Sequence, residues 1–440
     1  MEHYLRFGSH AEAKIFKEIK KHNFGITINA NVIAHTPLSI SKLLFIQLSK
    51  KDYFIDPQTY IFQVDPIKYY SATKGYEVVL KESIEVLLGE YKTQIADSVK
   101  KLQQPDFNVI KNNLKQLTEN VIEFQVDFLN KTFNKFSKEV GYSEYYKLFE
   151  KKNGFPKYLI PPYFFLTLDN AKGKNISEWL ELNIQAIKFS ERHKAVSKEL
   201  LAAELVLDNK LLLDEKKLNE IAKAYNSIDV KTIFLWIDQF DTYDQTHLVL
   251  KNYIVFLKKF KNKKIISLYG SFFDLLLTKE KVLGGFCHGP GYGEHRGVKP
   301  VGGGIPTAKF YLPSVYQRIR AEDAESIIAK KELFNSKYFS QICDCVQCKK
   351  ILKGSDSLET DFLKGYSDTQ LSKKGRETPT SNTLKNNQLH YLYKRFFENQ
   401  TMTVKKFIED SALMIKWLSE NTTIAYDYLI VWKKIFDEEK

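Results

Sequence analysis

The segment Thr232–Asp238, with the sequence TIFLWID, is a continuous apolar run that ends at an aspartate. Such a run is typical of a strand that is covered on both faces in a parallel sheet. Similar runs recur along the chain, and stretches with helical periodicity, such as Ser177–Arg192 and Glu215–Ala224, lie between most of them. The other expected strands are Ile26–Ala34, Tyr53–Asp56, Tyr158–Leu168, Leu200–Leu207 (which would also suit a helix), Lys264–Tyr269 and Val282–His288, with Ala308–Leu312 as a further candidate.

The alternation of these strands with helices predicts an α/β fold with a parallel sheet. Seven or eight strand–helix units in a chain of 440 residues suit a (β/α)8 TIM-type barrel, and a doubly wound open sheet is the competing architecture. We expect the barrel to comprise residues 1–75 and 147–340, interrupted by an inserted helical hairpin at residues 76–146. Residues 341–440 are expected to form a zinc-binding and C-terminal helical region.

The hairpin is expected because residues 76–146 contain two apolar stripes with spacings of three and four, the periodicity of amphipathic helices. The tripeptide Gln104-Pro105-Asp106 lies between the stripes and marks a turn. The insert would be either an ordinary packed helix pair or an arm that grips a substrate. The first stripe comprises Ile84, Leu87, Tyr91, Ile95, Val99 and Leu102, and the second comprises Ile110, Leu114, Leu117, Val121, Phe124 and Phe128.

The chain carries an excess of positive charge, because 66 Lys and Arg residues against 53 Asp and Glu residues give a formal charge of +13. A basic surface favours polyanionic partners such as nucleic acid, although a lysine-rich composition would give the same excess. The stretch Met1–Lys20 lacks the apolar core of a signal peptide, and no apolar run reaches the ~20 residues of a membrane span. These features predict a soluble cytoplasmic protein with no membrane partner.

Three of the four cysteines lie within six residues, in the motif CDCVQC, and a histidine follows 42 residues later. Three thiolates and one imidazole form a closed tetrahedral ligand set for zinc, which leaves no position for water, so we expect a structural zinc ion. His288 and His295 are alternative fourth ligands, and the remaining cysteine, Cys287, is expected to be a buried core thiol. The expected ligands are Cys343, Cys345, Cys348 and His390.

Two segments near the zinc motif have contrasting compositions. Residues Lys353–Asn387 are polar and are expected to form a long loop, with a helix from Gln388 onward. The stretch Gly284–Gly304 contains nine of the 20 glycines, begins at the end of an expected strand and matches neither a Walker loop nor a dinucleotide fingerprint. We expect it to be an active-site loop, because acidic, basic and aromatic residues interleave with its glycines. These residues are His288, Tyr292, Glu294, His295 and Arg296.

The motif CDCVQC, with Leu389-His390 at the head of a helix, resembles the zinc site of the tRNA-guanine transglycosylases. The resemblance implies a (β/α)8 barrel with a structural zinc near the C-terminus. The stretch Tyr53–Gln63 is similar to the family's strand-end motif, in which apolar residues precede Asp-Ser-Gly-Gly-Phe-Gln and the aspartate is the acid/base; that position is Asp56 here. The resemblance also implies base recognition by Asp169 and Glu204.

The chain departs from this family at several positions. Pro57-Gln58-Thr59 replaces Ser-Gly-Gly, and Phe286-Cys287-His288 lacks the nucleophilic aspartate that follows a Phe in the family. The helical hairpin is absent from the tRNA enzymes. The divergent pattern most resembles the DpdA-type branch, whose members are implied to exchange guanine for a 7-deazaguanine in the DNA of phage genomes or bacterial modification systems.

Base exchange requires two groups, one that attacks C1′ to give a covalent glycosyl-enzyme intermediate and one that handles the base protons. Its position at a strand end favours Asp238 as the nucleophile, with Asp56 as the acid/base and Glu294 as the reserve nucleophile. Tyr60 or Tyr292 could sandwich the flipped base. Further substrate contacts are expected from Asp169, Glu204, His288 and Arg296, and phosphate contacts from Arg296, Lys299 and Lys309.

The sequence therefore predicts a pentosyltransferase that acts on guanine in DNA, with a 7-deazaguanine base as co-substrate and helper proteins of a modification system as candidate partners. Three alternatives remain at this stage: a tRNA-specific transglycosylase, a non-catalytic zinc-stabilised nucleic-acid-binding subunit, and a hydrolase that releases the base without exchange. The absent nucleophile motif favours the binding subunit, whereas the several acids at strand ends favour an enzyme.

Overall fold

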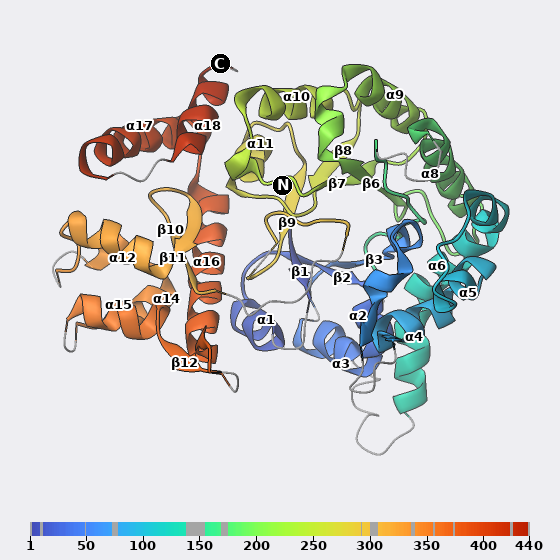
Figure 1. Ribbon diagram of the computed structural model, residues 1–440, viewed down its shortest axis with the longest axis horizontal. Coiled ribbons are helices and arrows are strands. Elements are labelled where there is room, and N and C mark those ends of the chain that lie inside the picture. Colours follow the sequence, from blue (N-terminus) through green and yellow to red (C-terminus); the bar gives the residue numbers. More distant parts are fainter. Residues whose placement is uncertain are drawn as a thin grey trace.

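A sheet of seven parallel strands lies at the centre of the molecule (Figure 1). Its order is β3–β2–β1–β9–β8–β7–β6, so that the first strand pairs with the last on one side and with β2 on the other. The strands are β1 (Glu2–Phe7), β2 (Gly25–Asn29), β3 (Tyr53–Asp56), β6 (Ala202–Asp208), β7 (Thr232–Asp238), β8 (Lys264–Ser267) and β9 (Gly285–His288). The structure is a computed structural model that describes residues 2–8, 12–48, 50–72, 78–137, 155–168, 175–291, 293–299, 307–335, 339–354, 357–372, 375–422 and 426–438.

Helices surround this sheet, and three antiparallel strand pairs lie outside it (Figure 1). The strand pairs are β4 (Tyr70–Ala72) with β5 (Val78–Leu80), β10 (Lys309–Leu312) with β11 (Gln317–Arg320), and β12 (Thr369–Leu371) with β13 (Glu377–Pro379). The helices are α1 (Ala13–Ile19), α2 (Ala30–His35), α3 (Pro37–Lys42), α4 (Glu82–Tyr91), α5 (Gln94–Lys100), α6 (Phe107–Ser137), α8 (Ile176–Ser190), α9 (Glu215–Asn226), α10 (His247–Lys258), α11 (Phe272–Lys279), α12 (Ala321–Lys330), α13 (Phe339–Ile342), α14 (Val346–Ile351), α15 (Leu358–Tyr366), α16 (Ser381–Thr401), α17 (Val404–Asn421) and α18 (Asp427–Glu438). Short helical turns are η2 (Leu43–Gln47), η3 (Thr59–Gln63), η4 (Pro66–Tyr69), η5 (Asn209–Leu213) and η6 (Thr242–Asp244).

The sheet curls into a half-barrel whose inner face is filled by aromatic side chains. Phe54 of β3 stacks on Phe234 of β7 with ring centroids 4.1 Å apart, although these strands are not neighbours in the sheet. The rings of Tyr4 and Tyr158 both pack edge-on against Phe234. A flat sheet could not bring these side chains together, so the curvature places the ends of distant strands around one site.

The expected strand Tyr158–Leu168 does not form a regular ladder: its part Tyr158–Leu166 runs beside both edges of the sheet and forms isolated bridges. Pro161 and Pro162 lie in its middle and have no backbone N–H to donate, which interrupts a regular ladder. The complete eight-stranded barrel therefore stays a prediction. The bridges pair Phe54 with Tyr158, Leu159 with Leu201, and Leu166 with Leu207.

Most expected strands are confirmed, with corrected bounds. Tyr53–Asp56 and Thr232–Asp238 have the expected limits, and residues 202–208 form a strand rather than a helix. The expected strand at residues 26–34 ends at Asn29, where α2 begins. The expected strand Ala308–Leu312 corresponds to β10, which pairs with β11 outside the sheet. Strand β1 was not expected from the sequence.

The described part of the insert packs as a helix layer beside the sheet. Its first expected helix is broken into α4 and α5, because Lys92 adopts a left-handed φ of 42° and Thr93 caps α5 by accepting a hydrogen bond from Ala96 N–H. Gln125 of α6 donates to the carbonyl of Ile160 and accepts from its N–H, at 2.7 and 2.9 Å. These bonds hold the Tyr158–Leu166 segment in place, as an ordinary packed helix layer would.

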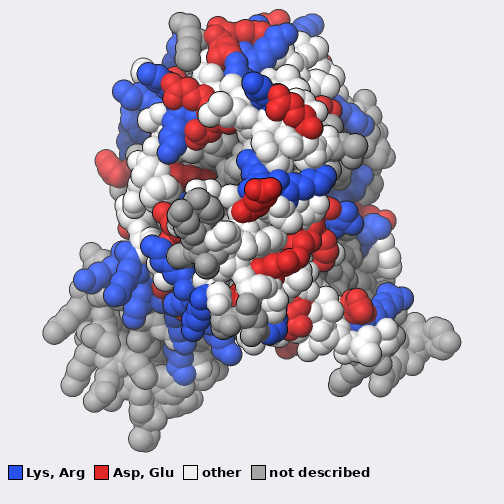
Figure 2. Space-filling model, turned by 90° about the vertical axis from the view of Figure 1, so that its left-hand side faces the viewer, with Lys and Arg blue, Asp and Glu red and all other residues white. Residues whose placement is uncertain are grey.

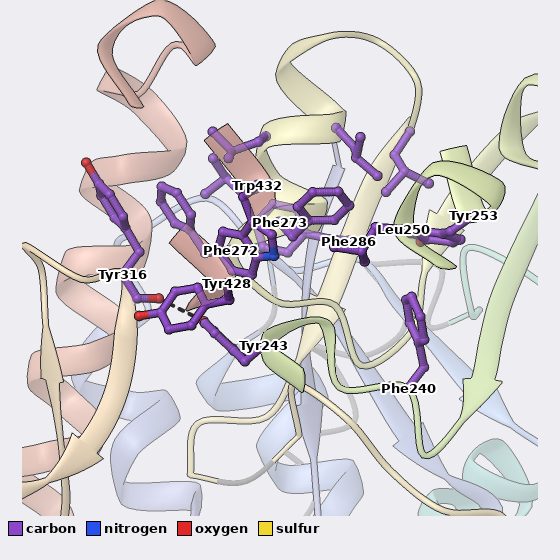
Figure 3. Close-up of a cluster of buried hydrophobic side chains, with 14 of the residues drawn as sticks. Phe240, Tyr243, Leu250, Tyr253, Phe272, Phe273, Phe286, Tyr316, Tyr428 and Trp432 are labelled. Atoms are coloured by element: carbon purple, nitrogen blue, oxygen red, sulfur yellow. Dashed lines mark hydrogen bonds between the residues drawn. The ribbon is translucent and has the colours of Figure 1, made fainter. Parts of the chain in front are cut away.

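The C-terminal region is anchored to the sheet by two helices. The prediction of a long loop at residues 353–387 is wrong, because α15, β12, β13 and the start of α16 lie there. Phe396 of α16 stacks on His22 with ring centroids 4.4 Å apart. Trp432 of α18 packs against Phe272 and Phe273 of α11 (Figure 3). Among the described residues, no helix combines the length and the apolar character needed to cross a membrane.

Candidate active site and metal centre

Two acidic side chains lie on the inner face of the sheet, on the two strands that flank the Tyr158–Leu166 segment. Asp56 ends β3, and Glu204 lies in β6 between the inward-facing Ala202 and Val206. Each of the two residues is only 2% exposed. The strands deliver both carboxyl groups to the interior because alternate residues of a strand face the same side.

The hydrogen bonds of the two acids differ. Oδ1 of Asp56 accepts hydrogen bonds from the Tyr163 hydroxyl at 2.6 Å and from the Gln58 N–H at 2.8 Å. Gln58 adopts a left-handed φ of 56°, which turns its N–H back toward the aspartate. Both carboxyl oxygens of Glu204 are buried without a hydrogen-bond partner. Buried groups of this kind are rare in proteins and are typical of functional sites.

The electrostatic environment raises the pKa of both acids. Burial raises the pKa of Asp56, while its hydrogen bond from Tyr163 and the charges of Arg296 and Arg6 act in the opposite direction. Burial also raises the pKa of Glu204 well above its usual value, and the charge of Asp56 adds to the effect. Two acids in one buried site cannot both ionise easily.

A cationic and aromatic wall faces these acids. Arg296 donates to the Tyr269 hydroxyl at 2.6 Å and to the Tyr60 hydroxyl at 3.4 Å, and its guanidinium lies over the Trp236 ring at 5.4 Å. Arg6 of β1 lies over the Tyr269 ring at 5.6 Å, and its Nε has no hydrogen-bond partner. The site thus combines acids, cations and flat apolar surfaces. Sequence reasoning missed Arg6 and Tyr163, for which no motif gives a signal.

The structure places Asp238 at the end of β7, beside Asp208 at the matching position of β6. Its side chain is partly buried and accepts a hydrogen bond from the Val298 N–H. Burial raises the pKa of Asp238, and the nearby charge of Asp208 raises it further. The hydrogen bond from Val298 and the charge of Lys299 act in the opposite direction. Asp238 is therefore accessible at the rim, whereas Asp56 and Glu204 lie together deeper inside.

The glycine-rich loop directs its functional residues to different places. Glu294 is 7% exposed, and its Oε1 accepts from the Tyr391 hydroxyl at 2.8 Å and pairs with Arg395 Nη2 at 2.9 Å. His295 is largely exposed and lies 2.9 Å from the Asp241 carboxylate. Among the described residues of the loop, only Arg296 turns toward the two acids. Because Glu294 is engaged by the C-terminal region, it has no role in the mechanism proposed below.

The remaining expected site residues do not join this cluster in the described part of the chain. His288 is fully buried, with Nε2 2.9 Å from His3 Nε2 and Nδ1 3.1 Å from the Tyr391 hydroxyl. Burial lowers the pKa of His288 well below its usual value, so it is a neutral packing residue. Lys299 and Lys309 are exposed, as phosphate contacts would require. Asp169 and Tyr292 lie outside the described residues.

The buried ion pairs of Arg395 with Glu294 and Glu398 are expected to stabilise the fold. Arg395 is fully buried; its Nη1 pairs with Glu398 at 3.4 Å in addition to the contact with Glu294. Replacing Arg395 with methionine removes the buried cation that pairs with both carboxylates and leaves Glu294 only its longer contact of 3.6 Å with Arg318, so the free energy of unfolding should fall by about 3–5 kcal/mol. Urea denaturation measures this loss.

A matched control for this prediction is Arg320→Met, which removes an exposed arginine that pairs with Asp323 at 2.9 Å. Its urea midpoint should hardly change, because exposed ion pairs contribute little. Equal losses in the two variants would contradict the role assigned to Arg395. Adding Glu294→Gln and Glu398→Gln to Arg395→Met should restore part of the lost stability.

Three thiols and one imidazole form a buried cluster in the C-terminal region. Their ligand atoms all lie within 4.8 Å of one another, as the sequence predicted. His390 Nδ1 is 3.4 Å from the sulfur of Cys345 and 3.3 Å from that of Cys348. This arrangement could hold a metal ion, and the donor set suits tetrahedral zinc. The cluster comprises Cys343, Cys345, Cys348 and His390.

Neighbouring groups orient the side chains of the cluster through hydrogen bonds. His390 Nε2 donates to the Tyr311 carbonyl at 2.7 Å, which leaves Nδ1 free to bind a metal. The Tyr366 hydroxyl lies 3.0 Å from the Cys348 sulfur. Burial alone would lower the pKa of His390, but the charges of Cys343 and Cys345 raise it to about 10. Burial raises the pKa of Cys348 well above its usual value, so a bound cation would be needed to hold all three cysteines as thiolates.

The outer face of the C-terminal region has an uneven charge distribution. Figure 2 views the molecule from the side on which this region lies, and shows basic side chains gathered at the lower left of the view and acidic side chains over its middle and top. Comparisons of the chain with protein-family models, with curated proteins and with solved structures find no match.

Proposed function

We propose that this chain is a guanine transglycosylase that exchanges guanine in DNA for a 7-deazaguanine base. The observation that carries the proposal is the pair of buried acids, Asp56 and Glu204, beside Arg296 and a set of aromatic rings. A nucleobase is flat and carries several hydrogen-bonding groups, so it suits a site of this composition. The resemblance of Tyr53–Gln63 and of the Cys3His motif to transglycosylases supports the same conclusion.

The proposed scaffold is a complete (β/α)8 barrel. The Tyr158–Leu166 segment bridges to both edge strands, β3 and β6, and would close the seven-stranded sheet as its eighth member. With this segment included, the strands follow one another around the ring in chain order. In such barrels the active site lies at the carboxyl ends of the strands, where Asp56 and Asp238 both stand.

In the proposed reaction, the Asp238 carboxylate attacks C1′ of the target nucleotide. The C1′–N9 bond breaks, the guanine leaves with the bonding electrons, and Asp56 supplies the proton that this base takes up. The incoming base gives a proton to Asp56, its ring atom attacks C1′, and the Asp238 carboxylate is released. Arg296 and Tyr60 would position the flipped base.

Zinc is proposed to be structural and to be held by Cys343, Cys345, Cys348 and His390. When bound, it would supply a fixed tetrahedral crosslink and no catalytic chemistry, since four protein ligands complete its coordination. The excess of positive charge, +13 for the chain, favours a nucleic-acid substrate. The resemblance to the DpdA-type branch favours DNA over tRNA.

The experiment that tests this function measures exchange of labelled guanine into DNA and into tRNA by the purified protein. We expect incorporation into DNA, and mass spectrometry should find a modified guanosine in DNA from cells that carry the gene. Incorporation into tRNA alone would replace DNA with tRNA as the substrate. Binding of DNA without exchange or base release would refute the enzyme and favour the binding subunit, and release of guanine without incorporation would indicate a hydrolase.

One substitution tests the proposed acid/base. Asp56→Asn keeps the size of the side chain but removes the titrating group, so base exchange should slow by about 10²–10⁴-fold. DNA affinity should change little, because Asp56 is buried away from the phosphates. Steady-state exchange rates and DNA-binding titrations measure the two effects. A rate within a few-fold of wild type would exclude Asp56 as the acid/base.

A further inference from the structure

The two buried acids lack any compensating cation in direct contact. Within the described part of the chain, no Lys, Arg or His nitrogen lies within 4.0 Å of either carboxyl group. Asp56 accepts two hydrogen bonds, from Tyr163 and Gln58, whereas neither oxygen of Glu204 has a partner with normal hydrogen-bond geometry. The Tyr163 hydroxyl lowers the pKa of Glu204 only against the larger effect of burial, because its proton is donated to Asp56. Hydrogen bonds that a carboxylate accepts favour its ionised form, and burial without them favours the protonated form. The geometry therefore distinguishes the two acids.

We propose that Asp56 and Glu204 share a single proton at neutral pH in the protein without substrate, with the proton on Glu204 and the charge on Asp56. When the nucleotide binds, Asp56 takes up from solvent the proton that it then supplies to the departing guanine. Glu204 is then a neutral carboxylic acid that holds one hydrogen-bond donor and one acceptor next to an ionised partner. The charge of Asp56 is one of the causes that raise the pKa of Glu204. Removing either acid should therefore change the titration of the other.

The other groups around the pair leave this assignment intact. The tyrosines and Cys287 stay neutral, because burial raises the pKa of each. The two arginines favour ionisation of the acids, yet the pKa of both acids remains raised. The groups that face Glu204 are Tyr60, Tyr163, Tyr225, Cys287 and Arg296. Asp56 additionally faces Arg6, Tyr91 and Tyr269.

The proton on Glu204 has a consequence for ligand recognition, which rests on the proposed function. A neutral acid pairs with an edge that presents a carbonyl next to an N–H, as the O6 and N1–H of guanine do. An ionised carboxylate would instead pair with two adjacent N–H donors, the N1–H and the exocyclic amine. Glu204 would therefore recognise bases with a lactam edge, with or without an exocyclic amine.

The protonation state can be tested without any assay of activity. A carboxyl group with a raised pKa in the folded state binds more protons when folded than when unfolded, so stability falls as pH rises above the usual value of 4.5. Glu204→Gln removes this loss. Its melting temperature should exceed that of wild type by about 1–3 °C at pH 8, and the difference should vanish toward pH 4.5.

The matched control is Glu123→Gln on the exposed surface of α6, which should show no such pH-dependent gain. Infrared spectroscopy of the wild type at neutral pH gives a second measure: the band of a protonated carboxylic acid should be present, and Glu204→Gln should lose it. A melting difference that does not change with pH, or the absence of this band, would overturn the shared proton.

Measurements of guanine exchange test the neutral state of Glu204 and the proposed transglycosylase function separately. Glutamine presents the same donor and acceptor as a neutral acid, so Glu204→Gln should lose less exchange activity than Glu204→Ala, by a factor of about 10 or more. Hypoxanthine, which lacks the exocyclic amine, should compete with guanine to a similar extent. A protonated Glu204 in a protein without exchange activity would refute the function alone. Exchange activity that Glu204→Gln abolishes would refute the neutral acid alone.

Discussion

Replacing Asp238 with alanine is expected to abolish the covalent adduct between the protein and DNA. The carboxylate is the proposed attacking group on C1′, and an alanine side chain has nothing with which to form the glycosyl-enzyme bond. Exchange of guanine should fall by about 10⁴-fold or more, since loss of a nucleophile removes the covalent route. Denaturing electrophoresis of protein trapped on guanine-containing DNA measures the adduct, and labelled guanine measures the exchange.

The chain offers a matched control in the neighbouring strand. Asp208 stands opposite Asp238 in the register of β6 and β7, and it accepts hydrogen bonds from Thr167 and from the Lys210 N–H at 3.0 Å. Asp208→Asn should therefore retain the adduct. An adduct that survives in Asp238→Ala would remove Asp238 as the nucleophile and direct the search to other groups at the rim.

The fold could be predicted where the sequence of a strand reflects burial alone. Thr232–Asp238 and Tyr53–Asp56 are apolar up to their last residue, and the structure confirms their bounds. Both end in an aspartate because the carboxyl end of a parallel strand opens into the site rather than into the core. The same feature that marks the end of these strands therefore marks the candidate catalytic groups.

Strand β1 escaped prediction because its sequence, EHYLRF, mixes charged and apolar residues. Its two inward-facing charged residues, Glu2 and Arg6, lie at opposite ends of the inner face of the sheet. Glu2 pairs with Lys264 at 2.8 Å at one end, and the charge of Arg6 at the other end lowers the pKa of Asp56. Only Tyr4 between them packs in the aromatic interior. A strand that lines a polar site thus lacks the continuous apolar run that identifies the others.

The partner of Asp56 could not be identified from the sequence, because it depends on register and on the curvature of the sheet. Glu204 and Asp56 lie 148 positions apart and meet only because β3 and β6 flank the same segment. The engagement of Glu294 by Arg395 is equally non-local, since it joins the glycine-rich loop to α16. Motifs revealed the individual acids, and packing determines which of them share a site.

Helix α16 connects the metal cluster to the rest of the molecule. His390 faces the cysteines, while the adjacent Tyr391 donates to Glu294 of the glycine-rich loop at 2.8 Å. Further along the helix, Arg395 pairs with Glu294, and Phe396 stacks on His22. Loss of the cluster should therefore loosen the loop that carries Arg296, even though no ligand touches the proposed active site.

Replacing Cys348 with alanine is accordingly expected to abolish binding of one equivalent of zinc and to lower the free energy of unfolding by about 5 kcal/mol or more. The three ligands that remain would bind zinc weakly. The free energy of zinc binding contributes directly to folding, and a fraction of the binding free energy known for zinc-finger peptides already amounts to several kcal/mol. Metal analysis of the purified protein and urea denaturation measure the two losses. Chelation of the wild-type protein should reproduce both.

Cys287→Ala provides the comparison that separates metal loss from loss of a buried thiol. Cys287 is 1% exposed in the interior of the sheet, and the four-residue metal cluster does not include it. This variant should keep its zinc and lose only about 1 kcal/mol, because a small apolar group is removed from the core. If both variants keep zinc, or if chelation leaves stability unchanged, the cluster does not act as a structural metal site. If Cys348→Ala alone loses both, the metal is the crosslink that holds α16, and with it the glycine-rich loop, against the sheet.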